Sequence, residues 1–328
     1  MAIDKLFEDF MDRVGLGAAD FTLPDFSTLT LTQTAERLRR SFFRATQAVE
    51  PDLPELQEIS NMIVDGAEGS LNARFYCPLG AGIGPGPLVV FFHGGGFVVG
   101  DLDSHDIMCR RIAHGARARL LAIEYRLAPE HPFPSAHEDA LAAYDWVIRN
   151  HALLNADLDR IGVSGDSAGG NLTAFLCQEM NRTGGPMPAF QLLIYPLLQF
   201  VDIRAKKMKL HESGFFLSRN LFEYFRDAYV EQETDRMDRR VSPLFADEDN
   251  LFGLPPTHII TCGWDPLRDE GIAYADRLAH CGVPVTKKDY AAFVHGFMNM
   301  TAGSSQIREA VNETGALIGR ALGSRSDT

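Results

Sequence analysis

The sequence predicts an α/β fold with a mostly parallel central sheet that is flanked by helices. Short, nearly continuous apolar runs recur along the chain, and a strand that helices cover on both faces has this pattern. Helical patterns such as "AHEDALAAYDWVIRNHA" separate most of the runs, which is typical of parallel sheets. The apolar runs are LVVFFH (88–93), RLLAIEY (119–125), RIGVS (160–164), FQLLIY (190–195), THIITCG (257–263) and VPVTKKDY (283–290).

The N-terminal part of the chain departs from this alternation. Residues 1–50 have the pattern of helices joined by a link that contains proline. Residues 58–64 and 71–77 flank the turn residues "AEGS" and predict an antiparallel pair of strands. We expect the whole chain, residues 1–328, to form a single domain.

A long segment at about 198–240 interrupts the later alternation and contains an aromatic-rich helical pattern. Open α/β sheets bind ligands at the carboxyl ends of their strands, and an insertion at this point of the chain would cover that edge. We therefore expect the segment to form a helical cap together with about residues 1–50. The alternative is an additional surface helix. The catalytic core would then consist of about residues 55–197 and 241–328.

Composition and charge exclude several classes of protein. A formal net charge of −13 disfavours broad contact with nucleic acid. The five cysteines lack a CxxC pair, which argues against a disulfide framework or a zinc site. No apolar stretch approaches the roughly 18 residues of a membrane span, and the N-terminus does not have the pattern of a signal peptide. We expect a cytoplasmic protein without a metal or organic cofactor.

The segment "GDSAG" places Ser167 between an apolar strand and a helical pattern. In a strand–turn–helix of the G-x-S-x-G type, a sharp turn lifts the serine hydroxyl clear of the sheet. The following helix directs its amino end at this serine, where it would stabilise negative charge. Two other interpretations remain for the glycines alone, a phosphate-binding turn of the dinucleotide type and an ordinary glycine turn.

A second glycine-rich segment, "HGGG" at 93–96, also follows an apolar strand. Glycines allow the backbone to present amide groups in conformations that other residues resist. We expect the amides of Gly94, Gly95 and Ala168 to form an oxyanion hole. The alternative is a flexible loop end without a chemical role.

Four motifs in order carry a family resemblance: "HGGGF", "EYRLAPEHPFPSAHEDA" (124–140), "GDSAGGN" and "GWDPLRDEG" (263–271). The chain resembles the hormone-sensitive-lipase-like carboxylesterases, the bacterial family IV of the α/β-hydrolases. The resemblance implies an α/β-hydrolase fold and a hydrolase of small, fairly soluble esters. The resemblance covers about residues 70–300. The predicted cap matches the family in its position along the chain more than in its amino-acid sequence.

A serine nucleophile needs a base, and the base needs an orienting acid. In this fold the chain order is serine, acid, histidine. The later histidines are His211, His258, His280 and His295. Of these, His295 lies just past the last apolar run and precedes Gly-Phe, as the family's catalytic base does, so it is the predicted base.

Three acidic residues in "GWDPLRDEG" are candidates for the orienting acid: Asp265, Asp269 and Glu270. Asp265 follows the strand pattern directly, precedes a proline and matches the family's triad position, so it is the predicted acid. Asp269 is the alternative. We expect Asp166 and His93 to hold nearby loops rather than to take part in the chemistry.

The resulting hypothesis is a serine carboxylesterase that hydrolyses short- to medium-chain esters through an acyl-enzyme. The alternatives are an amidase or deacetylase with the same residues, and a non-catalytic receptor. We expect Phe97, Phe216 and Phe297 to line the substrate pocket. The partner would be a small-molecule ester, and the run at 283–290 is a candidate edge strand for a homodimer.

Overall fold

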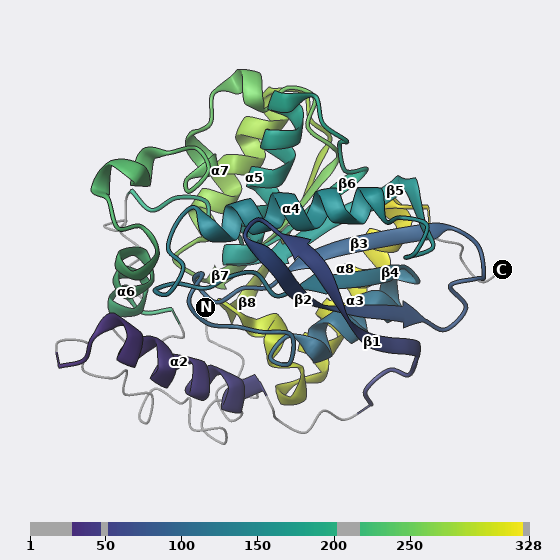
Figure 1. Ribbon diagram of the computed structural model, residues 1–328, viewed down its shortest axis with the longest axis horizontal. Helices are drawn as coiled ribbons and strands as arrows, with labels where there is room; N and C mark the ends of the chain where they lie inside the picture. The colour runs from purple at the N-terminus through teal and green to yellow at the C-terminus, as the bar shows by residue number, and fades with distance from the viewer. Residues whose placement is uncertain (1–27, 47–51, 202–216, 324–328) are drawn as a thin grey trace.

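The structure is a computed structural model that describes residues 28–46, 52–201 and 217–323. One sheet contains eight strands in the order β1-β2-β4-β3-β5-β6-β7-β8 (Figure 1). β2 pairs antiparallel with β1 and with β4, and all other neighbours are parallel, which confirms the predicted mostly parallel sheet. The strands are β1 (Leu56–Gly66), β2 (Gly69–Pro78), β3 (Gly86–Phe92), β4 (Arg119–Ile123), β5 (Ala156–Asp166), β6 (Phe190–Ile194), β7 (Thr257–Trp264) and β8 (Val285–Val294).

All six predicted apolar runs form strands, and the predicted antiparallel pair is β1 and β2. Several strands are longer than the sequence predicts, and two of these extensions bear on the site. β5 ends at Asp166, beside Ser167, and β8 continues past residue 290 to Val294, beside His295. These extensions place both residues at the ends of the sheet's central and edge strands.

The sheet separates two layers of helices (Figure 1). Successive residues of a strand face opposite sides, and β3 shows this clearly. Val90 and Phe92 pack in the apolar cluster that includes α4, α5 and α7, whereas Val89 and Phe91 pack in the cluster that includes α3 and α8. The helices are α2 (Leu31–Thr46), α3 (Asp106–Ala116), α4 (Ser135–Arg149), α5 (Ala168–Thr183), α6 (Arg219–Tyr229), α7 (Arg268–His280) and α8 (Ser305–Ala321).

Five short 3₁₀ helices complete the described secondary structure. They are η2 (Glu233–Met237), η3 (Pro243–Phe245), η4 (Glu248–Asn250), η5 (Phe297–Asn299) and η6 (Thr301–Gly303). Among the residues described, no helix is both long enough and apolar enough to cross a membrane.

Helices α2 and α6 lie together at one end of the molecule (Figure 1), and the Tyr224 hydroxyl donates to the Leu31 carbonyl at 2.8 Å. They belong to the two segments that the sequence predicts as a cap. The Arg39 side chain of α2 donates to the carbonyl of Val98 at 2.8 Å, so this pair is fastened beside the glycine-rich segment. Residues 1–27, 47–50 and 202–216 of the predicted cap lie outside the described residues, and the cap boundaries stay a prediction.

Because β3 and β5 to β8 run parallel, their carboxyl ends lie along the same edge of the sheet. The segments that follow β3, β5, β7 and β8 carry the residues that the sequence selects as the nucleophile, base, acid and oxyanion donors. This edge is where an open α/β sheet binds its ligands.

Candidate active site

Ser167 occupies a strained turn between β5 and α5. Its backbone has φ 53° and ψ −114°. Residues other than glycine rarely adopt this conformation, which costs about 1–3 kcal/mol. The turn also packs tightly against β3, because a Cβ atom on Gly169 would overlap the carbonyl oxygen of Phe92. The glycine spacing of "GDSAG" therefore has a steric cause, and it brings the serine to the end of the sheet.

The structure brings Ser167, His295 and Asp265 together. His295 Nε2 lies 2.9 Å from Ser167 Oγ, and His295 Nδ1 lies 2.9 Å from Asp265 Oδ2. All three side chains are buried. They come from three loops, after β5, β7 and β8, that the parallel strands deliver to one edge.

Asp265 is fixed in an orientation that determines the imidazole tautomer. Its Oδ1 accepts a hydrogen bond from the Leu267 amide at 2.8 Å, which leaves Oδ2 to accept from Nδ1–H of His295. The unprotonated Nε2 then faces the serine hydroxyl. The Tyr195 ring packs edge-on against the imidazole with ring centroids 4.9 Å apart. An imidazole held in this way can accept the hydroxyl proton.

The other candidates for base and acid lie elsewhere. His258 bonds to Thr286 between β7 and β8 at 2.6 Å, and burial lowers its pKa to about 4. His280 is exposed near Glu248, and Asp269 is exposed on α7. His211 lies outside the described residues.

One of the three predicted oxyanion donors is wrong. The Gly94 amide already donates to Asp166 Oδ1 at 2.7 Å, so it is not available to a substrate. The next two glycines have positive φ angles, 118° at Gly95 and 61° at Gly96. Within the described part of the chain, the amides of Gly95, Gly96 and Ala168 have no acceptor. Gly96 therefore replaces Gly94 in the candidate set, next to Gly95 and Ala168.

The glycine-rich segment is held from within the core and from α6. His93 Nδ1 donates to the Gly94 carbonyl at 2.8 Å, and its ring stacks on Tyr125 at 4.3 Å, as expected of a residue that holds this loop. Burial, together with nearby His105, lowers the pKa of His93 to about 4. On the other side, a Cβ atom on Gly96 would overlap the ring of Phe225 in α6. The loop is thus packed on both sides.

The prediction that Phe97 and Phe297 line the substrate pocket is wrong. Both side chains are completely buried. Phe97 stacks on Tyr229 with centroids 4.0 Å apart, and Phe297 stacks on Phe293 with centroids 4.7 Å apart. Both are core residues that support the neighbouring loops. Phe216, the third predicted pocket residue, lies outside the described residues.

A buried polar network that the sequence analysis missed lies below the nucleophile turn. Asn171, one helical turn after Ser167, donates to the carbonyls of Leu197 at 2.9 Å and Val241 at 2.8 Å. Its Oδ1 accepts from His137 Nε2 at 3.0 Å, and His137 Nδ1 accepts from the Tyr229 hydroxyl at 2.7 Å. The network fastens both ends of the 198–240 segment to α5. Polar residues within the otherwise apolar faces of α4 and α5 were the available signal.

Glu270, a rejected candidate for the acid, has a separate role in the structure. Its Oε1 accepts from the Leu198 amide at 2.6 Å, and its Oε2 accepts from Gln199 Nε2 at 3.0 Å. Burial raises the pKa of Glu270 to about 8, although these two hydrogen bonds oppose the shift. The carboxyl group attaches the first turn of α7 to the segment that leaves β6.

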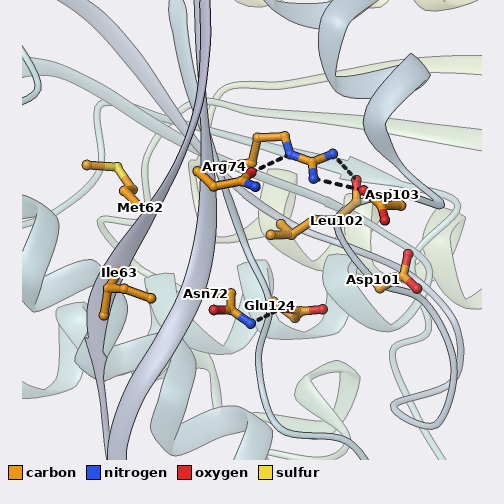
Figure 2. Close-up of a pocket in the computed structure, with 9 residues that line it drawn as sticks. Met62, Ile63, Asn72, Arg74, Asp101, Leu102, Asp103 and Glu124 are labelled. Carbon is orange, nitrogen blue, oxygen red and sulfur yellow. Dashed lines mark hydrogen bonds and ion pairs between the residues drawn. The ribbon is translucent and has the colours of Figure 1, made fainter.

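A separate hollow of about 360 Å³ lies along β2, and its lining does not include the three side chains of the candidate site (Figure 2). Its polar side chains are partnered, mostly with one another, and Asp101 accepts from the Ser104 amide at 2.7 Å. Arg74 Nη2 pairs with Asp103 at 2.8 Å, and Asn72 Nδ2 donates to Glu124 at 2.8 Å. With these groups partnered, we assign no ligand to the hollow.

A family model described as the α/β hydrolase fold matches residues 89–299. The chain belongs to the hormone-sensitive-lipase-like family of α/β-hydrolases. This confirms the family that the four sequence motifs predict.

Relatives of this α/β-hydrolase include two proteins of Mycobacterium tuberculosis. Carboxylic ester hydrolase LipN is 40% identical over 80% of this chain and 70% of its own. Esterase LipI is 40% identical over 80% of this chain and 82% of its own. Among solved structures, the ester-hydrolase EH1AB1 from the metagenome of Lake Arreo, in complex with a bipyridine phosphonate derivative, is 37% identical. Its TM-score is 0.89, and the match covers 98% of this chain and 100% of that one.

We predict that Glu270→Gln removes a pH-dependent part of the stability. The pKa of Glu270 in the folded chain, about 8, exceeds its ordinary value of 4.5. Between these two pH values the folded state therefore binds more protons than the unfolded state. The contribution of Glu270 to the free energy of unfolding decreases as pH rises, by at most about 1.4 kcal/mol per pH unit. Urea unfolding across this range should show the free energy of unfolding falling more steeply in the wild type.

The comparison between the two proteins isolates this carboxyl group. Burial lowers the pKa values of His93 and His137 to about 4. Between that pH and their ordinary pKa, these two histidines make the free energy of unfolding increase with pH, and they do so equally in both proteins. Parallel profiles for the wild type and Glu270→Gln would contradict the prediction.

Proposed function

We propose that this α/β-hydrolase is a serine carboxylesterase in which Ser167 is the nucleophile, His295 the general base and Asp265 the orienting acid. The observation that carries the proposal is the continuous contact from Asp265 through the imidazole of His295 to the serine hydroxyl, with 2.9 Å at each step. The names of the relatives, carboxylic ester hydrolase and esterase, support the class of reaction.

In the first half of the reaction, Ser167 Oγ bonds to the ester carbonyl carbon while its proton passes to His295 Nε2. The tetrahedral intermediate collapses when the bond to the alcohol oxygen breaks, and His295 gives the proton to the leaving alcohol. The acyl group then remains on Ser167. In the second half, water loses a proton to His295, attacks the acyl carbon and displaces Ser167, which recovers the proton.

The negative charge on the carbonyl oxygen needs donors that are already in place. We propose the amides of Gly95, Gly96 and Ala168, which have no acceptor among the described residues. Each such donor is typically worth about 3 kcal/mol in the transition state. Ala168 is the first residue of α5, so the positive end of the helix adds to their effect. Apart from the ester and water, these steps use only groups of the chain itself, and we propose no cofactor.

Esters are favoured over amides because the alcohol is the better leaving group. An amidase or deacetylase would use the same three side chains and remains the second candidate. A receptor that lacks catalysis would not need a histidine aligned between Asp265 and Ser167. That alignment therefore favours an enzyme.

Two further expectations about the protein stay predictions. The first is a cytoplasmic location.

The second is a homodimer formed through β8, which lies at the edge of the sheet. In β8, Lys287 pairs with Asp276 of α7 at 2.9 Å, and Lys288 lies 3.9 Å from Glu313 of α8. These exposed charges lie along the strand that a partner would approach.

Ser167→Ala should lower kcat for p-nitrophenyl butyrate by about 10⁴-fold or more, because no hydroxyl remains to form the acyl-enzyme. Circular dichroism should show a folded variant. The matched control is Ser164→Ala. Ser164 lies in the same strand, is fully buried, and its hydroxyl has no partner among the described residues. An active Ser167→Ala protein would contradict the proposal.

We further expect kcat/KM to fall for acyl chains beyond about eight carbons. The ring of Phe225 in α6 packs against Gly96 of the glycine loop, and we propose that it limits the length of the acyl pocket. A series of p-nitrophenyl esters from acetate to palmitate measures this preference. Matched anilides of the short acids in the same assay distinguish the esterase from the amidase. Higher rates on the long chains would contradict the expected limit.

A further inference from the structure

Asp166 lies between the nucleophile and the glycine loop, and the proposed reaction mechanism gives it no role. We propose that Asp166 is a positioning residue whose carboxylate holds the glycine loop in register with Ser167, so that the Gly95 and Gly96 amides face the developing oxyanion. This inference rests on the proposed function and adds a residue to it.

The contact to the loop is short and direct. The Gly94 amide donates to Asp166 Oδ1 at 2.7 Å, and a Cβ atom on Gly94 would come within 2.9 Å of the Asp166 carbonyl oxygen. The two backbones therefore touch without a side chain to separate them. Since Asp166 precedes Ser167 in the chain, any movement of the loop relative to the nucleophile would have to break this hydrogen bond.

The same carboxylate also contacts two other segments. His105 Nε2, at the start of α3, lies 3.4 Å from Oδ1, and Asn299 Nδ2 donates to Oδ2 at 3.5 Å. Asn299 belongs to η5, in the loop that carries His295. A single buried side chain thus contacts the loops of the oxyanion donors and of the base while it is covalently joined to the nucleophile.

The group is ionised in the folded protein. Burial opposes ionisation, but nearby His105 and the Gly94 amide more than compensate, so the pKa of Asp166 is below its ordinary value. Hydrogen bonds to a charged acceptor are shorter and stronger than neutral ones. A negative charge this close to the reacting centre would by itself disfavour an oxyanion. Asp166 would therefore aid catalysis through the position in which it holds the glycine loop, and not through its charge.

Asp166 does not act as the acid of the triad. Its oxygens contact Gly94, His105 and Asn299, whereas Asp265 contacts the His295 imidazole. The effect of Asp166 should therefore appear in the position of the oxyanion donors and leave the ground-state binding of substrate unchanged.

The test compares Asp166→Ala and Asp166→Asn with the control Asp139→Ala. Asp139 is an equally buried carboxylate that accepts from the Ala67 and Arg126 amides, each at 3.0 Å, far along the chain from the glycine loop. All three variants remove a buried charge, but of the two carboxylates only Asp166 accepts a hydrogen bond directly from the glycine loop. Steady-state kinetics with p-nitrophenyl butyrate and thermal unfolding are measured for each.

Asp166→Ala should lower kcat by about 10²-fold, the effect of losing one oxyanion donor, with KM within about threefold of the wild type. Asp166→Asn keeps an oxygen for the Gly94 amide and should recover most of the lost activity. Asp139→Ala should lower the melting temperature and retain kcat per folded molecule. If Asp166→Ala is not recovered folded, Asp166→Ser, whose side chain is shorter by one atom, replaces it with the same expectation.

A trifluoromethyl ketone provides a second readout, because it forms a tetrahedral oxyanion adduct with a nucleophilic serine. Its affinity should fall with kcat in Asp166→Ala, whereas the affinity of the matching secondary alcohol, which forms no adduct, should stay unchanged. The inference is overturned if kcat is unchanged in Asp166→Ala, if Asp166→Asn is no better than Asp166→Ala, or if Asp139→Ala loses the same activity. A wild-type protein without esterase activity would instead overturn the proposed function.

Discussion

The close packing between the end of β3 and the turn at Ser167 is the constraint on which the rest of the site depends. Ser167 has a positive φ, and Gly169 lies against the carbonyl of Phe92. Strain of this kind persists only when the surrounding structure enforces it. Here β3 and β5 pair in the middle of the sheet and α5 starts immediately after the serine, so the turn cannot relax without loss of core packing.

The parallel sheet converts this one local constraint into a complete site. Its strands end along one edge, and the loops that follow β3, β5, β7 and β8 lie close together although their residues are far apart in the chain. Buried polar groups then fix the loops to one another. Asp166 connects the glycine loop to the nucleophile turn, Asn171 fastens the 198–240 segment to α5, and Glu270 connects α7 to the segment after β6. Such groups need every partner in place, which gives the site a single arrangement.

The sequence predicts the features that depend on local pattern. Apolar runs predict the strands, and the positions of Ser167, Asp265 and His295 at strand ends predict their convergence. What it does not predict depends on contacts between distant segments. The Gly94 amide faces Asp166 rather than the substrate, and nothing in "HGGG" distinguishes the first glycine from the next two. Likewise, the sequence does not distinguish a phenylalanine that lines a pocket from one that, like Phe97, is buried in the core beside the site.

The most direct test of the account is to identify the atom that reacts with a phosphonate ester of p-nitrophenol. Trypsin should release residues 161–182, which contain Ser164, Ser167 and Thr173, and fragmentation by mass spectrometry can distinguish the three hydroxyl groups. The account predicts one phosphonyl group per chain, on Ser167, with loss of esterase activity in proportion to labelling. A label on any other residue that abolishes activity would contradict the account, as would full activity in a protein fully labelled at Ser167.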